Sequence, residues 1–157
     1  MRVRRGTHWR SRVTGSLAIA APSSGAAADA GKLLLRVSLG TLMLFHGIGK
    51  VIGGPAGIVG LVEKAGLPGS FGYLVYAGEV LAPLLLIIGL WTRAAAGVVA
   101  INMAVAVYLV HRHELFTLSK AGGWALELQG FYFFTALAVM LLGAGRFSFG
   151  GTAGRLN

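Results

Sequence analysis

The segment LLLRVSLGTLMLFHGIGKVI, residues 33–52, decides the class of fold. As a helix rising about 1.5 Å per residue, it reaches about 30 Å, the thickness of the hydrocarbon core of a bilayer. Three titratable side chains interrupt the apolar run: Arg36, His46 and Lys50. His46 and Lys50 are four residues apart, so they lie one turn apart on a helix. The segment therefore predicts a membrane-spanning helix whose polar groups need partners inside the protein.

The composition of the whole chain supports this prediction. Of its 157 residues, 55% are hydrophobic and 12% are charged, and the mean hydropathy is +0.74. The charged fraction is roughly half the ~25% of an average soluble domain. The chain has no cysteine, which excludes disulfides, thiolate-held iron–sulfur clusters and thiol catalysis within it. We expect one domain, embedded in a membrane.

Three more apolar segments follow, over about 73–91, 94–110 and 124–142. With 33–52, each is close to the ~17–25 residues that cross a bilayer as a helix. The predicted fold class is all-α, an integral membrane bundle of four antiparallel helices. The glycine- and proline-rich connection after the first helix is long enough to hold a short interfacial helix near 58–65.

We divide the chain into a tail (1–31), a transmembrane domain (32–150) and a C-terminal tail (151–157). The first tail opens with MRVRRGTHWRSR, which holds five of the 14 Lys and Arg residues. The apolar run Leu17–Ala21 is shorter than the ~7–15 residues of a signal-peptide core, so we expect a disordered cytoplasmic tail. Its charges lack a patch with stacking aromatic residues, which favours anionic lipid over nucleic acid.

The orientation follows from the positive charges near the helix ends. With both termini in the cytoplasm, nine Lys or Arg residues lie inside and four outside, leaving out Arg36 within the first helix. The sequence thus predicts an N-in, C-in, multi-pass protein of the plasma (inner) membrane. Arg93 and Arg146 then end helices at the cytoplasmic surface, where they anchor the protein.

Antiparallel helices also allow sequence position to be converted into depth. Four helices bring His46, Lys50, Glu79, His111 and Glu127 to one layer in the outer half. Because unpaired polarity is costly in hydrocarbon, we predict that His46 lies within hydrogen-bonding reach of Glu79, directly or through one water. Lys50 should reach the same carboxylate or the outer interface. A structural ion pair and a functional cavity both remain open.

Backbone features accompany this cluster. Pro83, four residues after Glu79, should kink the second helix beside the carboxylate. Gly40 and Gly47 should let a neighbouring helix approach closely. His111 and His113, two residues apart on a loop beside Glu114, are poor support for a metal site, and no metal, haem or nucleotide site is predicted.

Several pieces of the chain together resemble the DoxX family of membrane proteins. They are LLLRVSLGTLMLFHGIGK (33–50), AGLPGSFGYL (65–74), YAGEVLAPLLLIIGLWTR (76–93), GGWALELQGFYFF (122–134) and GAGRFSFGG (143–151). Their order and spacing carry the resemblance, which runs from about residue 32 to 150. The residues that match the family pattern are Arg36, His46, Gly47, Lys50, Glu79, Arg93, Trp124, Glu127 and Arg146.

The resemblance implies a four-helix membrane bundle. Members of the family are associated with quinone-linked oxidoreductase assemblies, including thiosulfate:quinone oxidoreductase, and with membrane complexes that handle oxidative stress. The function expected by resemblance is a membrane subunit of such an assembly that binds a quinone head group. His46 and Glu79 are the candidate catalytic residues. The candidate ligand-binding residues are Arg36, Lys50, Trp124 and Glu127.

Quinone is the cofactor implied, and an oxidoreductase subunit is the partner implied, beside the lipid bilayer. Whether the chain is an enzyme stays undecided, because it would be a subunit rather than a complete catalyst. Two other functions stay open on the sequence: a transporter of a small molecule or lipid, and a non-catalytic membrane scaffold for a partner protein.

Overall fold

The computed structural model describes residues 24–151 and 154–157. Every regular element in these ranges is a helix, and an isolated β-bridge joins Leu118 to Trp124. The fold is therefore all-helical in its described part. The predictions made for residues 1–23 lie outside the described residues.

The first helix, α1, is described over Ser24–Gly53, a length of 30 residues. The predicted disordered tail is thus wrong for residues 24–31, which are helical. The reason is the run of alanines there, since alanine has the highest helix propensity. The next helix, α2, spans Ala56–Lys64, which confirms the short helix predicted in this connection.

The second apolar segment is helical but irregular. It consists of the 3₁₀ turn η1 (Gly69–Tyr73), α3 (Leu74–Tyr76), the π-helical η2 (Ala77–Leu81) and α4 (Ala82–Ile88). Pro83 lies in the first turn of α4, where it cannot donate a hydrogen bond to the carbonyl of Glu79. A π-helical turn, a form found frequently at functional sites, directly precedes this position, and the kink predicted at Pro83 stays a prediction.

The third segment comprises α5 (Thr92–Ala106), the π-helical η3 (Val107–His111) and the 3₁₀ turn η4 (Arg112–Glu114). It begins after a turn in which Gly89 and Trp91 both have positive φ. A loop leads to α6, which spans Glu127–Leu142. Because α6 begins at Glu127, Trp124 lies in the loop rather than in the helix predicted from residue 124.

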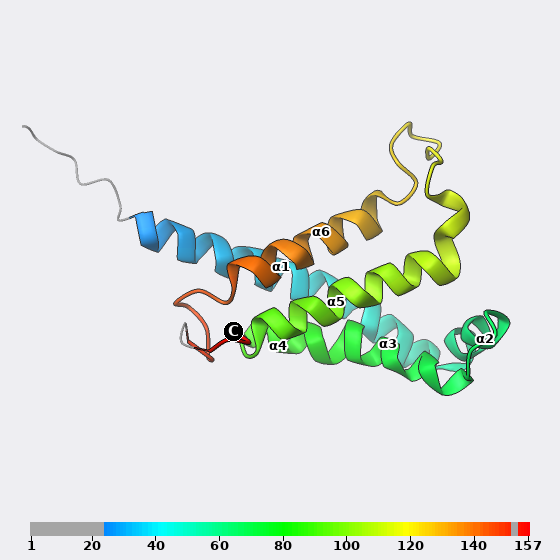
Figure 1. Ribbon diagram of the computed structural model, residues 1–157, viewed down its shortest axis with the longest axis horizontal. Coiled ribbons are helices and arrows are strands. Elements are labelled where there is room, and N and C mark those ends of the chain that lie inside the picture. Colours follow the sequence, from blue (N-terminus) through cyan, green and yellow to red (C-terminus); the bar gives the residue numbers. More distant parts are fainter. Residues whose placement is uncertain (1–23, 152–153) are drawn as a thin grey trace, which may run out of the picture.

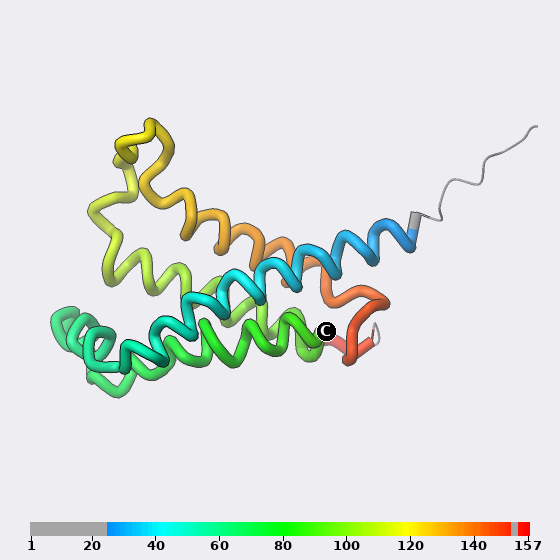
Figure 2. The backbone as a smooth tube through the Cα atoms, turned by 180° about the vertical axis from the view of Figure 1, so that it is seen from behind, coloured from blue at the N-terminus to red at the C-terminus, as the bar shows by residue number. Residues whose placement is uncertain are grey.

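In the part of the chain that the structure describes, α1, α3 with α4, α5 and α6 lie side by side and alternate in direction along the chain (Figure 1, Figure 2). Helix α5 packs against α6 and α4, and α1 packs against α4 and α6. The core between them includes Met43, Leu86, Ala96, Val99 and Ala136, none of which has any exposed surface.

We name the two ends of the molecule after the elements found there. The α2 end holds α2, η1 and the loop before α6, and the α4–α5 end holds the first turns of α1, the turn at 89–91 and the chain after residue 142 (Figure 1).

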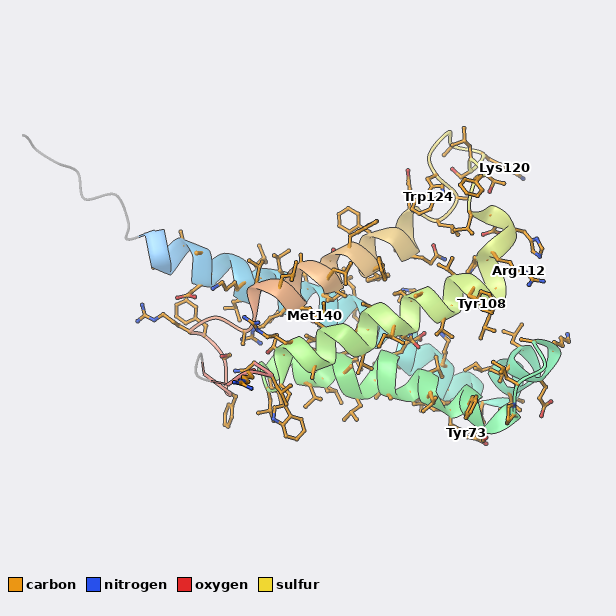
Figure 3. The ribbon with its side chains drawn as sticks, viewed as in Figure 1. Tyr73, Tyr108, Arg112, Lys120, Trp124 and Met140 are labelled. Atoms are coloured by element: carbon orange, nitrogen blue, oxygen red, sulfur yellow. The ribbon has the colours of Figure 1, made fainter. Side chains whose placement is uncertain are left out.

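The outer surface fits a bilayer. Large apolar side chains are exposed on every long segment, for example Phe45 on α1, Ile101 on α5 and Phe131 on α6. Figure 3 shows Tyr73 and Trp124 near the α2 end, and Trp91 is exposed at the other end. Tyrosine and tryptophan favour the two membrane interfaces.

Within residues 24–151 and 154–157, three helical stretches are long and apolar enough to cross a membrane: Gly25–Gly53, Gly69–Ile88 and Thr92–Glu114. The apolar α6 is shorter, at 16 residues. The protein is therefore a membrane protein with several candidate spans.

Glycines set the distance between α1 and its neighbour. A Cβ atom added at Gly47 would lie 2.0 Å from the carbonyl oxygen of Glu79, and one at Gly40 would lie 2.8 Å from that of Pro83. The close helix approach predicted from these two glycines is confirmed. As a consequence, Lys50, three residues after Gly47, reaches the same level as Glu79.

Candidate functional site

The carboxylate of Glu79 is the centre of a buried polar cluster. Only 2% of Glu79 is exposed, and it lies in the π-helical turn η2. The Nζ atom of Lys50 donates to both carboxylate oxygens, at 2.6 and 2.5 Å. The Nδ2 atom of Asn102, on α5, donates to Oε1 of Glu79 at 3.2 Å. Three helical segments thus meet at one carboxylate.

Small residues allow this meeting. Gly47 lets α1 touch the backbone of Glu79, which brings Lys50 onto its side chain. Gly78 lets α5 approach η2 closely from the other side, because a Cβ atom at Gly78 would lie 2.5 Å from the Cβ of Asn102. The hydroxyl of Tyr76 donates to the main-chain carbonyl of Lys50 at 3.3 Å. The cluster therefore depends on close backbone contact on both sides of Glu79.

A cavity of about 620 Å³ opens beside the cluster. Four polar side chains line it: Lys50, Glu79, Asn102 and His111. The rest of its wall is mostly aliphatic or aromatic and comes from α2, the segment after it, α5 and η3: Ile58, Leu61, Val62, Leu67, Phe71, Leu74, Val75, Val98, Ile101, Val105, Leu109 and Val110. A cavity of this size and polarity suits an apolar molecule with one polar group.

The cluster can both donate and accept hydrogen bonds. An ammonium group has three N–H donors, and two of those on Lys50 point to Glu79. The side chain of Lys50 is 35% exposed, whereas that of Glu79 is 3% exposed. A ligand oxygen in the cavity can therefore accept the third N–H of Lys50 while Glu79 keeps the ammonium in place.

His111 forms a second polar point on the cavity wall, at the α2 end. Its Nδ1 atom lies 2.9 Å from Oε2 of Glu114, and its Nε2 atom lies 3.4 Å from Nε2 of Gln129 on α6. The side chains of His111 and Glu114 are 30% and 50% exposed. This pair thus connects the cavity wall with the surface.

The predicted partner of Glu79 differs from the one observed. His46 is exposed, lies 3.3 Å from the hydroxyl of Tyr132 through its Nε2 atom, and packs edge-on against that ring. Among the described contacts, the direct bond predicted between His46 and Glu79 is absent, and Lys50 bonds the carboxylate instead. The reason is helix rotation: His46 is about 100° around α1 from Gly47, the residue that faces Glu79.

Two other predicted ligand residues lie away from the cluster. The indole N–H of Trp124 donates to the carbonyl of Leu115 at 2.8 Å, and the exposed Glu127 lies over Gly123 at the start of α6. Both line a shallow groove along α6 with Phe131 and other residues. The predicted outer layer therefore separates into the Glu79 cluster, the His111 pair and this groove.

Arg36, also predicted to bind a ligand, is found at the α4–α5 end. It is 2% exposed, and its Nη1 atom donates to the carbonyls of Leu86 and Ile87, each at 2.7 Å. Its Nη2 atom donates to the carbonyl of Phe147. Since the last carbonyls of a helix have no partner within it, Arg36 caps α4 and ties the chain after α6 to it.

The two arginines predicted as anchors lie at the same end. The Nε atom of Arg93 donates to the carbonyl oxygen of Asn157 at 3.1 Å. That of Arg146 lies 3.9 Å from Oδ2 of Asp29, and the Arg146 side chain is 74% exposed. Asp29 also faces Lys32 at 3.7 Å. These contacts fix local structure and leave Arg146 accessible to a membrane surface.

The sequence analysis missed Asn102 and Gln129. Each is an amide in a mostly apolar helix, which is the same signal that singled out Glu79. Our depth argument considered charged groups and histidines alone and so overlooked amides. Within the described residues, no three His, Cys, Asp or Glu side chains gather as a metal site would need.

Comparisons with known proteins agree with the resemblance seen in the sequence. Residues 31–112 match the DoxX family. An uncharacterized protein of Haemophilus influenzae is 32% identical over 116 residues, which cover 71% of this chain and 81% of that protein. No solved structure matches. Because the family match covers more than half of the chain, from α1 through the Glu79 cluster to His111, the protein belongs to the DoxX family.

Proposed function

We propose that this protein is a membrane subunit of a quinone-linked oxidoreductase assembly and that its Glu79 cluster binds the quinone head group. The DoxX family consists generally of membrane proteins associated with oxidoreductase and quinone-related function. The observation that carries the proposal is the cavity of about 620 Å³, apolar over most of its wall, with Lys50, Glu79 and Asn102 at one part of it. A polyprenyl quinone has the same division into a polar ring and an apolar tail.

The three side chains match the needs of both redox forms of the ligand. A quinone carbonyl accepts a hydrogen bond, which the third N–H of Lys50 can donate. A quinol hydroxyl donates one, which the carboxylate of Glu79 can accept. Reduction adds two electrons and two protons to the two carbonyl oxygens, and in the proposed assembly a partner subunit supplies the electrons. This chain would bind and orient the ring and supply protons near it.

The proposed setting is the plasma (inner) membrane, crossed four times by an antiparallel bundle with both termini inside. The distribution of Lys and Arg supports it, as does the apolar α6 packed against α5 and α1. At 16 residues α6 covers about 24 Å, so this crossing needs local thinning of the bilayer. Reporter fusions after Asn157 and near Lys64 should report opposite sides. If both fusions report the same side of the membrane, the number of crossings between Lys64 and Asn157 is even rather than the three proposed.

Quinone binding is tested with the purified full chain in lipid nanodiscs, using equilibrium binding of a short-chain ubiquinone. We expect Lys50→Met and Asn102→Leu each to weaken binding by at least about tenfold, the effect of losing a hydrogen bond from a charged or buried donor. Ala106→Phe, which places a ring in the cavity, should weaken it as well. His46→Gln is the matched control, because His46 faces Tyr132 and does not line the cavity.

If all four variants bind quinone as tightly as the unaltered protein does, the proposed site is contradicted. Loss of binding in His46→Gln alone would return the site to the residue predicted from sequence. Mass spectrometry of molecules that co-purify with the protein separates quinone from phospholipid as the natural occupant. Phospholipid without quinone would support the transporter alternative, for which the same cavity is a lipid site.

A further inference from the structure

We infer that His111, held by Glu114 and Gln129, is the group through which the cavity exchanges protons with water. This inference rests on the proposed function, because it concerns the protons that quinone reduction takes up. His111 lines the same cavity as Glu79 and Lys50. It is also partly exposed and bonded to a half-exposed carboxylate. Among the polar side chains on this cavity wall, it is the one bonded to a group at the surface.

The contacts of His111 suit a residue that gains and loses a proton. Its Nδ1 atom lies 2.9 Å from Oε2 of Glu114, so Nδ1 carries a hydrogen and donates it. In the neutral ring, Nε2 is then an acceptor, and the amide nitrogen of Gln129 at 3.4 Å can donate to it. The neutral form of His111 therefore has a partner at both nitrogens.

The protonated form can be satisfied by the same two residues. Protonation adds a hydrogen at Nε2, which then needs an acceptor. The Oε1 atom of Gln129 is buried and has no hydrogen-bond partner in the described structure. A half-turn of the Gln129 amide presents this oxygen to Nε2 of His111. Because no other bond holds that oxygen in place, the amide is free to follow the protonation state of the ring.

Other charged groups lie on the elements next to His111. Helix α2, which packs against η3, carries Glu63 and Lys64, and Glu63 lies over Gly69. In η4, the Nε atom of Arg112 donates to Nε2 of His113. Among the contacts of His111 in the described structure, Glu114 is the charged one.

The route to the ligand is the cavity itself. Asn102 and His111 are nine residues apart on one helical segment, a rise of about 13 Å, and both line the cavity with Glu79. In the proposed sequence, Lys50 gives a proton to the reduced ring oxygen. Water in the cavity then returns a proton from His111 to Lys50, and bulk water reprotonates His111. Each cycle of these transfers delivers one proton to the ring, and two cycles supply the two protons of the quinol.

The test measures proton uptake rather than enzymatic turnover. Short-chain ubiquinone is bound at saturation to the full chain in nanodiscs and is reduced by two equivalents of the methyl viologen radical, a one-electron donor whose oxidation releases no proton. A pH-indicator dye follows the two protons taken up. We expect His111→Gln to slow proton uptake by about a hundredfold or more, the lower end of the range for loss of a general acid–base group. Added imidazole should restore much of the rate, because it replaces the missing ring.

His113→Gln is the matched control, since His113 is a neighbouring exposed histidine that does not line the cavity; its uptake should equal that of the unaltered protein. Gln129→Leu, which removes the amide, should slow uptake as well. Unchanged uptake in His111→Gln with quinone bound overturns the inference and leaves the proposed function standing. Slow uptake without rescue by imidazole would assign His111 a structural role instead. Failure of the unaltered protein to bind quinone overturns both.

Discussion

The two ends of the protein use buried charge in different ways. At the α4–α5 end, Arg36 donates to three main-chain carbonyls, and the neighbouring turn and chain pack around it. At the α2 end, Lys50 and Glu79 bond each other through side chains, and a cavity lies beside them. A charge bonded to carbonyls stabilises the fold, whereas a charge pair with an open side is available to a ligand.

This contrast explains why the depth of a charged residue in the membrane did not distinguish structural residues from candidate ligand-binding ones. Arg36 and Glu79 are both 2% exposed, and both come from apolar helices. What distinguishes them is the kind of partner and the space next to it. Variants of Arg36 should therefore lose stability, whereas variants of the Glu79 cluster should also lose quinone binding. The predictions below run from the largest expected effect to the smallest.

The largest loss of stability is expected for Arg36→Met. It leaves the carbonyls of Leu86, Ile87 and Phe147 without their donor in a buried place. At about 1–3 kcal/mol for each unsatisfied group, the free energy of unfolding should fall by at least about 3 kcal/mol. Thermal unfolding in detergent, followed by loss of the monodisperse peak in gel filtration, measures it. An unchanged melting temperature would mean that Arg36 is not a structural cap.

A smaller loss is expected for the single variants Lys50→Met and Glu79→Leu, and for Lys50→Met it is the larger of the two. Removing Lys50 leaves an unpaired carboxylate that is 3% exposed, whereas removing Glu79 leaves an ammonium that is 35% exposed and can be solvated. The double variant should recover much of the stability of the single ones, because replacing a buried ion pair by apolar groups is often neutral. Its quinone binding should stay weaker than that of the unaltered protein by at least about tenfold. Recovery of stability without recovery of binding marks the pair as part of a ligand site.

Gly47→Ala should cost about 1–3 kcal/mol through overpacking, because its Cβ would lie 2.0 Å from the carbonyl oxygen of Glu79. Gly49→Ala, two residues later on the same helix, is the control, since nothing lies within 4 Å of the added atom. There we expect a small gain, as alanine favours helix. Equal melting temperatures for the two variants would show that α1 does not touch η2 as described.

The smallest effects are expected for Arg93→Lys and Arg146→Lys. The Arg146 side chain is 74% exposed and 3.9 Å from Asp29, and surface changes usually shift stability by less than about 0.5 kcal/mol. Insertion and folding should be unchanged in both variants, as judged by expression in membranes and gel filtration. Loss of quinone binding in either folded variant would place a ligand site at the α4–α5 end.

The sequence predicted the helical segments and singled out Arg36, Lys50 and Glu79, because both follow from apolar length and from the rarity of charge in hydrocarbon. It predicted that Lys50 could reach Glu79, and it predicted the close approach at Gly47. It placed His46 in direct reach of Glu79, whereas Lys50 bonds the carboxylate, because the choice between the two depends on the rotation of α1 about its axis. Gly47, which fixes this rotation, was understood as a packing residue and was not used to orient the helix.

The cavity could not be predicted for a different reason. It depends on where α2 and η1 pack relative to α5, and such contacts between distant segments leave no simple periodic signal. Asn102 could have been found, since it is an isolated amide in an apolar helix. Its contact with Glu79 also needs Gly78 beside it, a requirement visible only once the helices are placed.

The glycines next to the cluster have a consequence for recognising this site in other sequences. A carboxylate in an apolar helix is common to structural ion pairs and to ligand sites. Here it is paired with a lysine three residues after Gly47, and it directly follows Gly78. A related protein that keeps the glutamate but carries a larger residue at either glycine cannot bring the same three helices together. The spacing of glycine and charge, rather than the charge itself, is therefore the feature by which such sites can be sought.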